Sequence, residues 1–198
     1  DAAGLIEGVE PAEDCRAGEK ENQQPAKPVV IAPPSGGPIE MSAARVHQTN
    51  GNAAKASQCG GKKVIAHFTN DQGNGGRGFF QEIKEQWGAG PSREYFEWHR
   101  DRGHNDFRMG AVQFVEVSRL VEVANIIGEA GNRSGSRGPP MRCDAIEEAL
   151  QALGQHAAKN EASVHIPRII RGGQWDKIHP LLKKMSAAHG VEVYVYGK

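Results

Sequence analysis

The chain has 198 residues, with 24 acidic and 24 basic residues and no net charge when histidine is neutral. This neutral balance argues against a dedicated nucleic-acid-binding protein, whose domain is usually strongly basic. No apolar run approaches the ~18 residues of a membrane span, and the first residues lack the basic start and apolar stretch of a signal peptide. The length allows one domain with a tail.

The spacing of the cysteines points to a reducing compartment, and the spacing of the histidines argues against a metal site. The three cysteines, Cys15, Cys59 and Cys143, are widely spaced and form no C-x-x-C pair. The eight histidines show no spacing typical of metal ligands. We therefore expect an intracellular protein, cytoplasmic or nuclear, with no metal site and no cofactor.

Residues 1–38 have the composition of a flexible tail or linker. They carry 6 of the 11 prolines and little apolar surface to offset the entropy lost on ordering. Charge changes near residue 60, with 5 basic and 8 acidic residues up to it (net −3) and 19 and 16 beyond it (net +3). The sequence predicts a disordered tail over 1–38 and a folded domain over 39–198.

From Lys62 onward, short apolar strands alternate with helices of 3.6-residue apolar spacing. Residues 39–41 are compatible with a short strand, and the small polar residues 48–61 predict a loop. The later strands are expected at 64–68, 110–117, 120–127, 162–169 and 191–196. One helix is expected from Phe79 and a second from Ser92 as cap to Arg102. A third is expected after Asp144 as cap, with apolar positions at Ile146, Ala149, Leu150 and Leu153. The last is expected around 178–185, with Pro180 near its start. This alternation predicts an α/β domain layered around a largely buried sheet.

The most informative segment is the loop Asn70–Gly78, with the sequence NDQGNGGRG. It leaves a buried-type strand and enters a helix, so its glycines allow close backbone approach near free helix N–H groups. This arrangement favours a phosphate or diphosphate. Arg77 adds a positive charge, and Asp71 adds an acceptor for an amine or hydroxyl. The alternative is a plain strand-to-helix turn.

Residues 73–78 also fit the dinucleotide pattern G-x-G-x-x-G. That pattern requires an acidic residue about 20 positions later at the end of a strand. Glu94 and Glu97 lie at that distance, but within a predicted helix. A nicotinamide-dinucleotide enzyme is therefore a distant alternative, and a P-loop is excluded because no Gly-Lys-Ser/Thr follows.

Two further glycine-rich loops, 128–138 and 171–173, follow later strands and supply Arg133, Arg137 and Arg171. Ligands in open α/β sheets sit outside the carboxyl ends of the strands. The three loops are therefore expected to line one crevice.

Three segments together resemble the macrodomain family. Residues 64–78 resemble its first ligand loop, residues 162–175 its second ligand loop and helix start, and residues 191–196 its last strand. Within that family, the segments most resemble the divergent branch that holds Appr-1″-phosphate-processing proteins, the terminal ADP-ribose glycohydrolase and a chromatin-remodeller macrodomain. It implies a three-layer α/β/α fold with a central mixed sheet and an ADP-ribose cleft at the strand ends.

The resemblance also implies site residues. The ligand-binding set is Asn70, Asp71, Gly73, Gly76, Arg77, Gly78, Ile170, Arg171, Gly172 and Gly173. The chain departs from the family in four places. No Gly-Asp pair follows the first strand, Gly75 stands where relatives often carry Trp, the second loop is about three residues short, and the catalytic Lys/Asp pair of the glycohydrolase is not found.

The resemblance implies a monomer that binds ADP-ribose, free or attached to protein, with no membrane partner. One alternative is a hydrolase that removes ADP-ribose from protein or processes a small ADP-ribose derivative, with Asp71 as its catalytic candidate. The second alternative is an interaction domain that has lost ligand binding.

Overall fold

The computed structural model describes residues 43–56, 60–131, 140–168 and 174–197. The predicted tail and the expected strand at 39–41 lie outside these residues. The described part forms one six-stranded sheet in the order β1-β6-β5-β2-β4-β3. Its strands are β1 (Val46–Asn50), β2 (Lys62–Asn70), β3 (Val112–Ser118), β4 (Val121–Glu129), β5 (Ala162–Pro167) and β6 (Val193–Gly197).

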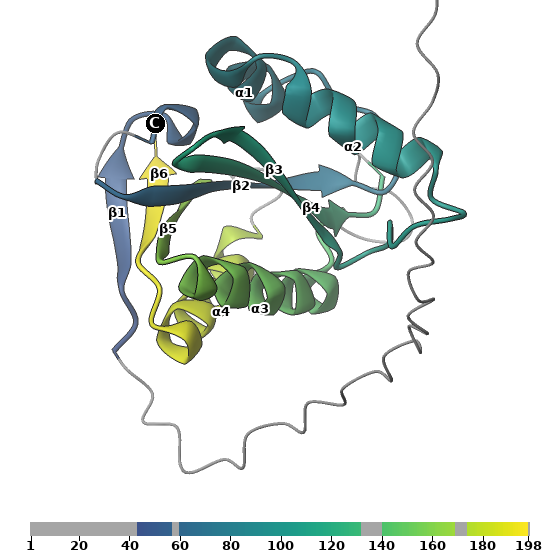
Figure 1. Ribbon diagram of the computed structural model, residues 1–198. Helices are drawn as coiled ribbons and strands as arrows, with labels where there is room; N and C mark the ends of the chain where they lie inside the picture. The colour runs from purple at the N-terminus through teal and green to yellow at the C-terminus, as the bar shows by residue number, and fades with distance from the viewer. Residues whose placement is uncertain (1–42, 57–59, 132–139, 169–173, 198) are drawn as a thin grey trace, which may run out of the picture. The chain divides into compact units, whose positions relative to one another are not determined.

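The neighbouring strands pair in parallel except β3, which runs antiparallel to β4. On one side of the sheet lie α1 (Phe79–Trp87) and α2 (Gly90–Arg100), and on the other lie α3 (Cys143–Lys159) and α4 (Trp175–His189) (Figure 1). A short 3-10 helix, η1 (Ala53–Lys55), follows β1. The predicted three-layer α/β/α fold with a mixed sheet is confirmed.

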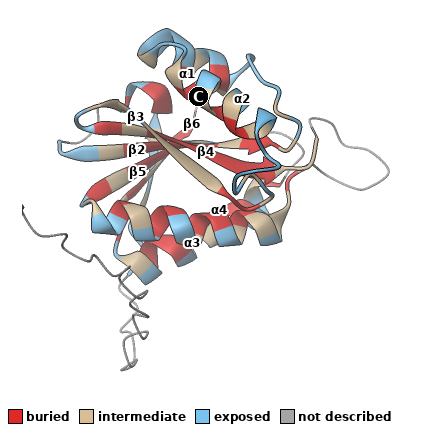
Figure 2. Cartoon of the chain, turned by 45° about the vertical axis from the view of Figure 1, so that its right-hand side comes forward, coloured by how far each residue is buried: buried red, intermediate tan, exposed pale blue. Residues whose placement is uncertain are grey.

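Alternate residues of the central strands serve the two faces of the sheet, as the period of a strand requires. Val64 of β2 packs in the cluster that holds Leu150 and Leu182 of the helices α3 and α4. Its neighbour Ile65 packs with Ile83 of α1 on the opposite face. Burial on both faces explains the continuous apolar runs of these strands, and Figure 2 shows the buried residues gathered between the helical layers.

Helix starts differ from the sequence predictions. Helix α2 begins at Gly90 with Pro91 in its first turn, so Ser92 is not its cap. A proline fits there because the first amides of a helix need no partner. Helix α3 begins at Cys143, so Asp144 lies within the first turn, where its charge still suits the helix dipole. Pro180 lies inside α4, beyond the first turn, on an exposed position.

The predicted loop over residues 48–61 is wrong in part, because β1 extends to Asn50 and η1 follows it. None of the described helices has the length and apolar character needed to cross a membrane.

The sheet order positions the candidate site. Strands β4, β2 and β5 are adjacent and parallel, so their carboxyl ends reach the same edge of the sheet. The segments that follow these ends are the three glycine-rich segments of the sequence. The strand order also differs from the dinucleotide-binding order, in which the first strand lies centrally, and Glu94 and Glu97 both lie in α2. The structure thus gives no support to a nicotinamide-dinucleotide site.

Candidate functional site

The loop between β2 and α1 leaves the sheet through an irregularity in the β2–β4 ladder. The pairing register shifts between Thr69 and Asn70. Three glycines of the loop, Gly73, Gly76 and Gly78, have φ values of +62°, +113° and +62°. These backbone conformations are readily accessible only to glycine. The tip, Asn74 to Gly78, is exposed and includes Arg77, so its backbone is open to a ligand.

Asn70 organises the start of this loop. Asn70 as a whole residue is 7% exposed. Its Nδ2 donates to the Asn74 carbonyl at 2.8 Å, and its Oδ1 accepts from the Gln72 amide at 2.9 Å. The Tyr95 hydroxyl of α2 donates to the Asn70 carbonyl at 2.6 Å. Asn70, which the resemblance implies as a ligand contact, therefore directs its side-chain amide into the loop itself.

Asp71 joins the first loop to the end of β4. Its Oδ1 accepts from the Gly131 amide at 2.7 Å and from Gln72 Nε2 at 2.8 Å. Its own amide donates to the Glu129 carbonyl at 2.9 Å. The carboxylate is half-buried and fixed in place. Asp71 thus couples the loop after β2 to the segment after β4.

Glycine is required at two loop positions by close neighbours. A Cβ on Gly73 would lie 2.1 Å from the His99 ring of α2, and one on Gly75 would lie 2.9 Å from the Phe80 ring of α1. At Gly76 and Gly78 a Cβ would meet no atom of the described residues within 4 Å. Gly73 and Gly75 therefore pack against helices, whereas Gly76 and Gly78 border open space.

Gln174 connects the chain just before α4 to the chain just before α3. It is 5% exposed and lies directly before α4. Its Oε1 accepts from the Met141 amide at 3.3 Å, and its Nε2 donates to the Met141 carbonyl at 3.2 Å. This paired contact fixes the start of α4 against Met141, two residues before α3 begins. The sequence analysis missed both Tyr95 and Gln174, since neither type has a distinctive spacing.

The remaining predicted site residues are Ile170, Arg171, Gly172 and Gly173, which lie outside the described residues, as do Arg133 and Arg137. The described part of the site therefore consists of the Asn70–Gly78 loop, the end of β4 and the residues that hold them.

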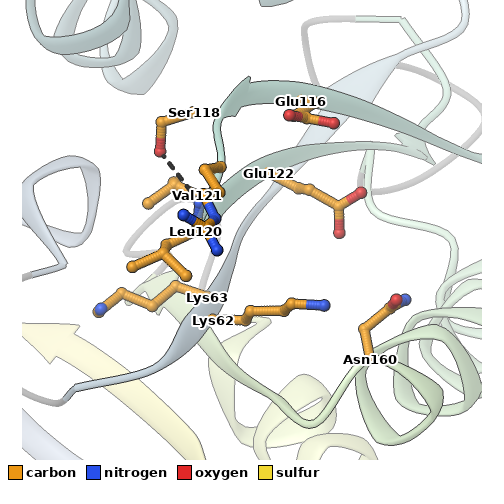
Figure 3. A pocket seen from close by; sticks show the side chains of 9 residues that line it. Lys62, Lys63, Glu116, Ser118, Leu120, Val121, Glu122 and Asn160 are labelled. Atoms are coloured by element: carbon orange, nitrogen blue, oxygen red, sulfur yellow. Dashed lines mark hydrogen bonds between the residues drawn. The ribbon is translucent and has the colours of Figure 1, made fainter.

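The described residues also line a shallow cavity at the amino ends of β2 and β4, on the opposite edge of the sheet. Lys62, Lys63 and Arg119 lie there with Glu116 and Glu122. Figure 3 shows the two lysines extending in opposite directions. Because acidic and basic side chains both line this cavity, it does not form a preorganised anion-binding site. The sequence predicted no function for this edge of the sheet.

Comparison with known proteins identifies the class. No protein-family model matches the chain. A macrodomain protein from Streptomyces coelicolor is 42% identical to it, with a TM-score of 0.70, over 77% of this chain and 99% of that one. The chain therefore belongs to the macrodomain family, as the sequence resemblance predicted.

Two further relatives extend this comparison. The chain is 27% identical over 143 residues to the Chromodomain-helicase-DNA-binding protein 1-like of Mus musculus. The matched region is 67% of this chain but only 15% of the mouse protein. Thermosipho africanus DarTG, solved in complex with ADP-ribose, shares the fold with a TM-score of 0.59 and 12% identity, over 80% of this chain and 42% of that one.

Proposed function

We propose that this macrodomain binds ADP-ribose, free or attached to protein, at the carboxyl edge of its sheet. The observation that carries the proposal is the exposed loop tip between β2 and α1. Gly76 and Gly78 there have positive φ values, and no atom of the described residues would contact a Cβ on either. The loop ends at the first turn of α1. Backbone amides at such a position favour a diphosphate.

Two further points support the proposal. Arg77 provides a charge-assisted donor at the same tip. DarTG, which shares the fold, was solved with ADP-ribose bound. The second loop, with Ile170, Arg171, Gly172 and Gly173, is proposed as the other side of the diphosphate site, with the family resemblance as its support.

Calorimetric titration tests the function. ADP-ribose should bind at least about tenfold more tightly than AMP, because the diphosphate and distal ribose add contacts with the loop. AMP and NAD serve as matched comparators. Tighter binding of NAD would contradict the proposal, and absence of any binding would favour an interaction domain without a ligand.

A hydrolase that removes ADP-ribose from protein, or processes a small derivative, is the second candidate. The fixed, half-buried Asp71 carboxylate favours it, because a held carboxylate suits the orientation of a water molecule. Intracellular action on ADP-ribosylated protein, by a monomer, is part of the same proposal.

Asp71→Asn separates binding from turnover. The amide oxygen retains an acceptor for the Gly131 N–H, so ADP-ribose affinity should change by no more than about fivefold, as for one hydrogen bond. Any hydrolysis shown by the parent should fall by about 10² or more, as on loss of a general base. Asp71→Ala, which also loses the Gly131 contact, is the comparison and should weaken binding further. Equal hydrolysis by parent and Asp71→Asn would restrict Asp71 to a structural role.

A further inference from the structure

The hydroxyl of Tyr95 lies where the first loop begins. Tyr95 is fully buried in α2. Its oxygen is 2.6 Å from the Asn70 carbonyl and 3.2 Å from Asn70 Oδ1. Asn70 then holds Asn74 and Gln72 through its side chain. One phenol therefore connects helix α2 to the residue from which the loop is folded.

The ring of Tyr95 is itself held firmly. Its centroid lies 5.4 Å from that of Phe80 and 6.2 Å from that of Phe107, both in tilted contacts. Phe80 in turn packs under Gly75. The helix layer thus supports the loop at Asn70 and again at Gly75.

The phenol remains a donor at any ordinary pH. Burial, with smaller contributions from the charges of Asp71 and Glu129, raises the pKa of Tyr95 well above its usual value. The backbone of Gly73 and the side chain of Thr69 partly oppose this rise of the Tyr95 pKa. A protonated hydroxyl surrounded by loop atoms suits a role in fixing the shape of that loop.

We propose that Tyr95 is a positioning residue for the ADP-ribose loop: its hydroxyl fixes the turn at Asn70 and so presents Asn74–Gly78 to the ligand. The effect on ligand affinity rests on the proposed function, whereas the effect on the loop does not. Tyr95 itself is fully buried and acts through the backbone.

The test compares Tyr95→Phe with Tyr196→Phe. Tyr196 is the matched control, because it is also a buried tyrosine, 4% exposed, whose hydroxyl has a polar partner, His165 Nδ1 at 2.9 Å. Tyr196 lies in β6, which β5 separates from β2. Amide hydrogen exchange of the ligand-free proteins and ADP-ribose titration are measured on each, under conditions where urea titration shows both to be folded.

In Tyr95→Phe, exchange of the Gln72 amide should accelerate and ADP-ribose affinity should fall, each by about tenfold, because the turn loses one buried hydrogen bond. Tyr196→Phe should leave both quantities at the parental value. Parental exchange in a folded Tyr95→Phe chain, or an equal change in both variants, would overturn the proposal.

Two further results are possible: the parent does not bind ADP-ribose, or Tyr95→Phe does not fold. If the parent does not bind ADP-ribose, the proposed function fails, and the exchange measurement still decides the role of Tyr95. If Tyr95→Phe does not fold, the NMR spectrum of the ligand-free parent decides instead. The Tyr95 hydroxyl proton, buried and held by the Asn70 carbonyl, should be visible and exchange slowly with water. A Tyr95 hydroxyl proton in fast exchange with water would likewise overturn the proposal.

Discussion

Replacing Gly76 by valine should weaken ADP-ribose binding by at least about 100-fold, or ~2.8 kcal/mol, while the chain stays folded. The φ of Gly76 is +113°, a region in which a β-branched residue is strained. Within the part of the chain that the structure describes, a Cβ there meets no atom within 4 Å, so the added side chain would occupy the space proposed for the ligand. Calorimetric titration measures the effect.

Gly61→Val is the matched control. Gly61 also has a positive φ, +84°, and open space above it, but it precedes β2 at the opposite edge of the sheet. The Gly61→Val variant should have a comparable backbone strain and bind ADP-ribose with the affinity of the parent. Parental affinity in folded Gly76→Val would place the ligand elsewhere, and equal losses in both variants would attribute the effect to the fold.

The free energy of unfolding should fall as the pH drops from 6.5 towards 4, and buried histidines are the cause. Burial lowers the pKa of His67 to about 4, partly opposed by its hydrogen bond with Asn125, and burial also lowers that of His165 to about 4. The unfolded chain binds these protons near pH 6.5 and the folded chain does not. The stabilisation is therefore complete above pH 6.5 and is lost on acidification.

Proton linkage at His67 alone should lower the free energy of unfolding by about 2 kcal/mol between pH 7 and pH 5. His67→Gln, whose side chain does not titrate, should remove this part of the pH dependence in urea unfolding. His104→Gln changes an exposed histidine and should leave the dependence unchanged. An unaltered pH slope in His67→Gln would assign the acid sensitivity to other groups.

Periodicity predicted the elements that bury whole faces. The predicted strand 64–68 lies within β2, and both faces of β2 pack in the core. The apolar spacing of Ile146, Leu150 and Leu153 predicted α3, and these three side chains form the fully buried face of that helix. Local sequence was sufficient here because each pattern matches one element's own period.

Strand β1 shows what local pattern misses. In its sequence VHQTN only Val46 and Thr49 are half-buried, and the strand is an edge of the sheet. Its order comes from pairing with β6, which lies almost 150 residues later (Val46 with Val193). The sequence predicted β6, but a contact so distant in the chain leaves no periodic signal in β1 itself.

The candidate site was predictable where it depends on glycine, and not where it depends on distant partners. The Asn70–Gly78 loop follows from its composition and its place between strand and helix. The use of Asn70 within the loop depends on Tyr95, and that of Asp71 on Gly131, 60 residues away. These partners come together only through the sheet order, so the sequence could not distinguish a loop-organising residue from a ligand contact.

The most direct test of the account is the location of ADP-ribose on the folded chain. Amide NMR spectra recorded during titration with ADP-ribose should show their largest shift changes at Gln72 to Gly78 and at Gly131. Changes concentrated instead at Lys62, Lys63 and Arg119, on the opposite edge of the sheet, or no saturable change at all, would contradict the proposed binding site.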